Sequence, residues 1–129
     1  MSRQPEPVFA TATHQEIAAQ LDVARTLNAA GHAGAALLLA WSCLEALART
    51  ALGARMSTPQ RPGSVLETLA FEGFVSPSDA DRIRPFVAKR NRLAHGDLSV
   101  RLSQMEIDDF THIISDALEV SKTPEPAST

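Results

Sequence analysis

The stretch from residue 33 to residue 52, AGAALLLAWSCLEALARTAL, limits the possible folds more than any other part of the chain. Only Glu45 and Arg49 are charged in this run, so a helix here would be apolar on nearly every side. A run of about 20 apolar residues is long enough to span a membrane. Because two charges interrupt this run and no second such run exists, we expect no membrane association and a central helix in an all-α bundle.

Helix start and stop signals occur throughout the chain and no segment has the pattern of a strand. Three capping boxes are indicated, in which a hydroxyl side chain is followed three residues later by an acid: Thr13 with Glu16, Ser64 with Glu67, and Ser103 with Glu106. Ser76 before Pro77 predicts a fourth helix start. Three glycines mark helix ends: Gly31, Gly73 and Gly96. The predicted helices are 14–30, 33–54, 65–73, 77–95 and 104–121.

The chain has 129 residues, a length that suits one domain. We expect a loose N-terminal tail over 1–12, a single helical domain over 13–121 and a disordered C-terminal tail over 122–129. The predicted fold class is all-α, an up-and-down bundle of four to five helices. One cysteine excludes an internal disulfide, and the N-terminus has no apolar signal region, which together favour a cytoplasmic location.

The net charge of −3 argues against a general nucleic-acid coat protein, but the charges are unevenly distributed. Half of the 12 basic residues lie in one segment: Arg82, Arg84, Lys89, Arg90, Arg92 and Arg101. A basic segment in an acidic chain is compatible with a local anion site. The four histidines show no metal-ligand spacing, so we expect neither a metal nor another cofactor.

Arg90 and Glu45 both fall on apolar sides of their predicted helices. On a helical wheel, Arg90 lies in the middle of an apolar stripe, whereas Lys89 and Arg92 lie outside it. A buried charge of either sign needs a partner. An ion pair of Glu45 with Arg90 or with Arg49 could serve only to fix the packing; alternatively, Glu45 could hold Arg90 beside a phosphate site.

His95 is the last residue before the expected helix end at Gly96, where exposed carbonyl groups favour a protonated imidazole. Asn91, four residues earlier, lies on nearly the same face and could orient the ring through a hydrogen bond. The simpler interpretation is that His95 is a helix-end cation beside a glycine cap.

Arg90, Asn91 and His95 together resemble the motif "R, polar residue, three residues, H" of the HEPN superfamily, the higher eukaryote and prokaryote nucleotide-binding domains. The segment AALLLAWSCLEALAR is similar to the long core helix of bacterial HEPN proteins. The segment GFVSPSDADRIRPFVAKRNRLAHGD is similar to their fourth helix and its entry. The resemblance covers roughly residues 14–120.

The resemblance implies a HEPN-like bundle that forms a homodimer and acts as a metal-independent endoribonuclease of the toxin or phage-defence type. It implies catalytic roles for Arg90 and His95 at a dimer-interface cleft, with Asn91 as a supporting residue. Glu45 would be a second supporting residue, and the RNA would contact two further cations, Lys89 and Arg92. An antitoxin or another defence protein is the expected partner.

Two observations qualify this expectation. On a regular helix His95 lies about 140° around the axis from Arg90, so both can act on one phosphate only if two subunits meet or the helix unwinds. Some HEPN toxins also carry a tyrosine, the target of a partner nucleotidyltransferase, where this chain has Asp97; the chain contains no tyrosine. A non-catalytic HEPN-like module that binds a nucleotide or RNA, and a structural or partner-binding bundle, remain as alternatives.

Overall fold

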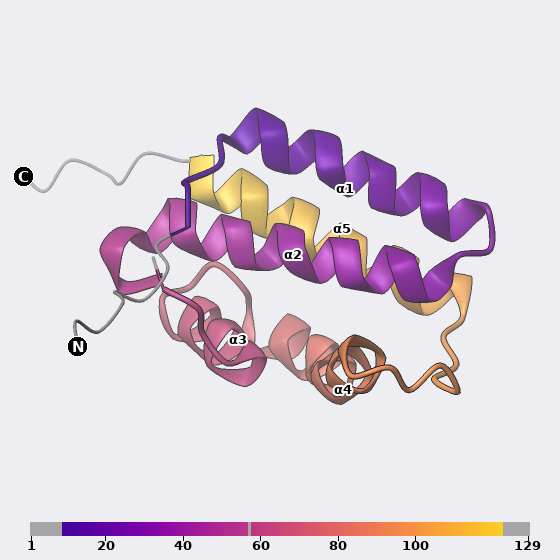
Figure 1. Ribbon diagram of the computed structural model, residues 1–129. Coiled ribbons are helices and arrows are strands. Elements are labelled where there is room, and N and C mark those ends of the chain that lie inside the picture. The colour runs from indigo at the N-terminus through magenta and orange to yellow at the C-terminus, as the bar shows by residue number, and fades with distance from the viewer. Residues whose placement is uncertain (1–8, 57, 123–129) are drawn as a thin grey trace, which may run out of the picture.

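The apolar segment forms α2 (Ala33–Leu52), the central helix of an all-α bundle in the computed structural model (Figure 1). The structure describes residues 9–56 and 58–122, and those residues contain helices but no strand. The predicted fold class is therefore confirmed. The remaining elements are α1 (His14–Ala29), the 3₁₀ helix η1 (Gly53–Met56), α3 (Pro62–Phe71), α4 (Pro77–Ala94) and α5 (Gln104–Lys122).

The core is built around α2. Trp41 and Leu44 are almost completely buried, and the Trp41 ring lies 5.7 Å from the Phe110 ring of α5. Phe110 also stacks on Phe86 of α4 at 5.1 Å, so one row of aromatic rings joins three helices. Among the described helices α2 alone is long and apolar enough to cross a membrane, but its buried residues pack into this core in the manner of a core helix.

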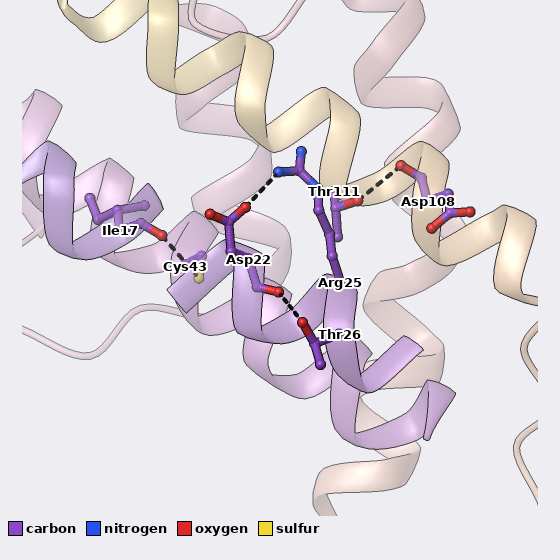
Figure 2. Close-up of polar contacts among 7 residues, drawn as sticks. All are labelled: Ile17, Asp22, Arg25, Thr26, Cys43, Asp108 and Thr111. Carbon is purple, nitrogen blue, oxygen red and sulfur yellow. Dashed lines mark hydrogen bonds and ion pairs between the residues drawn. The ribbon is translucent and has the colours of Figure 1, made fainter. Parts of the chain in front are cut away.

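Helices α1 and α2 form an antiparallel hairpin along one side of the bundle (Figure 1). Gly31 closes it with a φ of 91°, a conformation that glycine adopts without steric cost. The thiol of Cys43 donates a weak hydrogen bond to the backbone oxygen of Ile17 at 3.9 Å (Figure 2). Burial raises the pKa of this thiol to about 11.

Most predicted helix starts are observed, and one is wrong. Thr13 and Glu16 form the reciprocal capping box of α1, and the Ser76 hydroxyl accepts the backbone N–H of Asp79 at the start of α4. α3 begins at Pro62 and not at residue 65, which leaves Ser64 inside the helix as an exposed residue. A proline in the first turn is already restricted to a helical φ, which explains the earlier start.

The segment from residue 9 to residue 12 lies against α2, although it belongs to the tail that was expected to be loose. The Arg49 guanidinium lies 4.9 Å from the centre of the Phe9 ring. The Thr50 hydroxyl donates a hydrogen bond of 2.7 Å to the backbone oxygen of Ala12. The expected C-terminal tail lies outside the described residues, apart from Lys122, which ends α5.

Candidate functional site at the carboxyl end of α4

The carboxyl end of α4 carries the arginine and histidine that the sequence singles out. The core side of α4 is formed by Ala80, Ile83 and Phe86, all buried. Arg90 lies one turn beyond Phe86 and is half-buried, which agrees with its position on the helical wheel. The helical period therefore places a guanidinium at the edge of the core.

Arg90 has no carboxylate partner among the described residues. Its Nη1 donates a hydrogen bond of 3.1 Å to the side-chain oxygen of Asn91, an uncharged acceptor. Neither of the ion pairs considered for Glu45, with Arg90 or with Arg49, is formed within the described part of the chain. The Arg90 guanidinium therefore lies at the bundle surface without an anionic partner among the described residues.

The distance along α2 explains why Glu45 does not reach Arg90. The end of α4 packs on the first turn of α2, where a Cβ on Gly34 would lie 3.5 Å from a methyl group of Leu93. Glu45 lies three turns further along α2, about 16 Å away at 1.5 Å per residue. The half-buried Glu45 side chain makes no hydrogen bond or ion pair with a described residue.

His95 ends α4 as its C-cap residue and is exposed. Its backbone N–H donates to the carbonyl oxygens of Asn91 at 3.1 Å and Arg92 at 3.2 Å, and Gly96 then turns the chain with a φ of 90°. No described residue hydrogen-bonds the imidazole. The expectation that Asn91 orients His95 is therefore not met, because the Asn91 oxygen accepts from Arg90 instead.

The two cations expected to bind RNA are paired with carboxylates. Lys89 Nζ lies 3.2 Å from Glu106 Oε2 of α5. Arg92 Nε donates to Asp97 Oδ2 at 2.8 Å, just beyond the helix end. Both pairs are partly exposed, so solvent and salt weaken them. These cations contribute less unpaired positive charge to the surface than the sequence suggests.

Asp97 fixes the turn that follows α4. The Ser99 hydroxyl and the Ser99 backbone N–H donate to its Oδ1 at 2.6 Å and 3.0 Å, while Arg92 holds the other oxygen. The Ser99 hydroxyl first, and then Arg92, lower the pKa of Asp97 to about 2. The sequence signal for this turn is an aspartate two residues before a serine, a pattern that favours local hydrogen bonds to the backbone. The hydrogen bonds to both carboxylate oxygens show that Asp97 stabilises the turn after α4.

A groove of about 230 Å³ lies beside the site, between α4 and α5. The Phe86 and Phe110 rings line it, as do Arg82 and Asp109, whose Nη2 and Oδ2 atoms lie 3.3 Å apart. Glu106, the partner of Lys89, also lines the groove. Each charged side chain that lines the groove therefore has an ion-pair partner. Within residues 9–56 and 58–122, no group of three His, Cys, Asp or Glu side chains is arranged for a metal ion.

Comparisons of the chain with protein-family models, with curated proteins and with solved structures found no match. What the structure itself shows is an all-α helical bundle in which α4 ends with a half-buried arginine that has no carboxylate partner among the described residues and with an exposed histidine.

Proposed function

We propose that this protein is a metal-independent endoribonuclease of the HEPN type that acts as a homodimer in the cytoplasm. The observation that carries the proposal is the state of Arg90. Arg82, Arg84, Lys89 and Arg92 of the same helix each contact a carboxylate, whereas among residues 9–56 and 58–122 the side chain of Arg90 has only a neutral amide as its partner. A half-buried guanidinium that lacks an anion is suited to a phosphate group.

The proposed reaction uses the RNA itself as the nucleophile. The 2′-hydroxyl attacks the adjacent phosphorus, the bond to the 5′ oxygen of the next nucleotide breaks, and the products are a cyclic phosphate and a 5′-hydroxyl end. Arg90 would stabilise the charge that develops on the phosphoryl oxygens. His95 would transfer a proton to or from the reacting oxygens, an effect worth about 10²–10⁴-fold in rate. Neither role requires a metal.

Asn91 has a clear part in this proposal, and Glu45 does not. The Asn91 oxygen accepts from Arg90, so Asn91 would position the guanidinium and not the imidazole. Glu45 is too far along α2 to support Arg90 in the same chain. Lys89 and Arg92 would contribute to RNA binding only by exchanging their carboxylate partners for phosphates. An antitoxin or a defence partner would have to act without a tyrosine target.

The test is an RNA cleavage assay in the presence of a chelator, with analysis of the RNA ends. We expect Arg90→Ala and His95→Ala to lower the cleavage rate by at least about 100-fold. The matched controls are His112→Ala, an exposed histidine on α5, and Arg84→Ala, a paired arginine on α4. Both controls should retain activity within a few-fold, and RNA with a 2′-deoxy sugar at the cleaved position should resist.

A non-catalytic module that binds RNA or a nucleotide is the second candidate. The observation that favours it is the imidazole of His95, which no described residue orients. Folded wild-type protein that binds varied RNAs but leaves them intact would support this candidate and exclude the nuclease. A strong loss of thermal stability in Arg90→Ala, without any ligand, would instead indicate a purely structural bundle.

A further inference from the structure

Two opposite charges lie one turn apart on the less buried side of α2 and do not pair. Glu45 and Arg49 are both half-buried, and neither forms an ion pair or a side-chain hydrogen bond with a described residue. Side chains four positions apart on a helix are neighbours, and opposite charges at this spacing normally attract each other. A half-buried charge without a partner loses hydration and receives nothing in return. The two charges therefore indicate a place where a ligand of complementary charge would be stabilised.

Arg49 is held in place although no anion contacts it. Its guanidinium carbon lies 4.9 Å from the centre of the Phe9 ring, and its Nε atom is buried without an acceptor. A phenyl ring attracts the cation but has no oxygen or nitrogen that could accept a hydrogen bond. The planar guanidinium matches the two oxygens of a carboxylate, so Arg49 is suited to bind one.

An apolar groove of about 240 Å³ lies beside these charges, between α1 and α2. Four residues of α2 line it: Leu39, Ser42, Cys43 and Ala46. Ser42 is one turn before Glu45, and Ala46 is one turn before Arg49, so the groove and the two charges share one stretch of the helix. The Ser42 hydroxyl already donates to the backbone oxygen of Leu38 at 3.0 Å, which leaves the α2 wall suited to an apolar group.

The α1 side of the groove directs a ligand carboxylate towards Arg49. Ile17 contributes a buried apolar surface, and Gln20 is neutral. Glu16 lines the same side, and its carboxylate accepts the backbone N–H of Thr13 at 3.1 Å as part of the α1 capping box. A negative group at that wall repels an anion, so the carboxylate of a ligand is stabilised only on the α2 side.

We propose that this groove binds a free α-amino acid with an apolar side chain. The α-carboxylate pairs with Arg49, the α-ammonium pairs with Glu45, and the side chain enters the groove beside Leu39 and Ala46. Residues four apart on a helix have Cβ atoms about 5–6 Å apart, so both side chains can reach two charges that one carbon carries. The groove is smaller than the roughly 300–1,000 Å³ of pockets for drug-sized ligands, which agrees with a ligand of this size.

The charges of the site favour a zwitterion over other ligand classes. A simple anion such as a fatty acid or a phosphate would be repelled by Glu45 and would leave it without a partner. A simple cation would do the same to Arg49. An apolar molecule without charge would leave both side chains unpaired. Only a ligand that carries both charges satisfies both side chains.

Titration calorimetry with leucine, methionine and phenylalanine tests the binding, and no RNA is needed. We expect saturable binding of at least one of the three. Two analogues of the ligand that binds each remove one charge: the amide lacks the carboxylate, and the N-acetyl derivative lacks the ammonium. Each analogue should bind at least about tenfold more weakly, because one hydrogen-bonded charge pair is lost. Aspartate should not bind, since its side chain is not apolar.

Crossed variants distinguish direct contact from a structural role. Glu45→Gln should weaken leucine binding at least about tenfold but leave the affinity for N-acetyl-leucine unchanged or higher. Arg49→Gln should weaken leucine binding but not the binding of leucine amide. Arg25→Gln is the matched control, because Arg25 pairs with Asp22 on α1, and it should bind leucine like the wild type. Ala46→Leu should fill the groove and abolish binding with an unchanged circular dichroism spectrum.

Three results would overturn the inference. The first is the absence of saturable heat with all three amino acids at millimolar concentration. The second is equal affinity for leucine and both analogues, which would show that neither charge contacts the ligand. The third is a non-additive loss of stability in the ligand-free double variant of Glu45 and Arg49, which would show that the two charges pair with each other in solution. Loss of RNA cleavage, in contrast, would leave this site unaffected.

Discussion

Asn28 is a buried polar residue that joins the end of α1 to the start of α5, and its replacement gives the sharpest stability prediction. The side chain is 1% exposed. Its Nδ2 donates to the backbone oxygen of Gln104 and to Oδ1 of Asp108, both at 2.9 Å. Asn28→Ala removes both hydrogen bonds while the Gln104 amide can still donate to the backbone oxygen at position 28.

The expected cost follows from these two bonds. A hydrogen bond to a neutral carbonyl contributes about 1 kcal/mol, and one to a charged carboxylate about 2 kcal/mol. The greater helix propensity of alanine returns about 0.6 kcal/mol. The net loss in the free energy of unfolding is therefore about 2 kcal/mol, and for a domain of this size it lowers Tm by about 8 °C.

Urea unfolding and calorimetry of Asn28→Ala, Asp108→Ala and the double variant measure this effect as a double-mutant cycle. We expect a coupling energy of about 1 kcal/mol or more between the two positions. Asp109→Ala is the control, because Asp109 contacts Arg82 of α4 and should be additive with Asn28→Ala. A cost below about 0.5 kcal/mol for Asn28→Ala, or additivity with Asp108→Ala, would refute the reasoning.

Three further predictions concern single side chains. The Ser99 hydroxyl and Arg92 lower the pKa of Asp97 from 3.8 to about 2. This carboxylate should therefore stabilise the turn fully above pH 3.8 and lose that effect as the pH falls towards 2. An NMR titration of its carboxyl carbon measures the pKa directly. Cys43, with its pKa raised to about 11, should react with a thiol reagent at least about tenfold more slowly in the folded chain than in urea. Phe110→Ala, which removes a ring packed against two other aromatic rings, should cost about 3–5 kcal/mol in urea unfolding, and a cost near 1 kcal/mol would contradict the described packing.

Local sequence signals predicted the helices well because they act within one turn. Thr13 and Ser76 cap the helices that the sequence assigns to them, and Gly31 and Gly96 have the positive φ expected of helix ends. The helix start predicted at Ser64 was wrong, because Pro62, two residues earlier, begins the same helix sooner.

The candidate site was predictable only in part, because helical periodicity gives the direction of a side chain but not what lies opposite it. The wheel placed Arg90 in the middle of the apolar stripe, and the structure has its side chain half-buried there. It could not show that the end of α4 packs three turns away from Glu45, nor that Asn91 bonds to Arg90 and not to His95. Those relations depend on the axial position of each helix relative to the helix it packs against, and no local sequence pattern encodes that position.

The way α4 is held has a consequence for its dynamics. α4 buries few residues, and ion pairs of Lys89 and Arg82 connect it to α5 across a partly open groove. Mobile ions screen such exposed pairs over a Debye length of about 10 Å at 0.1 M salt. Backbone amides of α4 should therefore exchange with deuterium faster as salt is added, whereas those of α2 stay protected. Ionic strength would then set how often the helix that carries Arg90 and His95 opens away from the rest of the bundle.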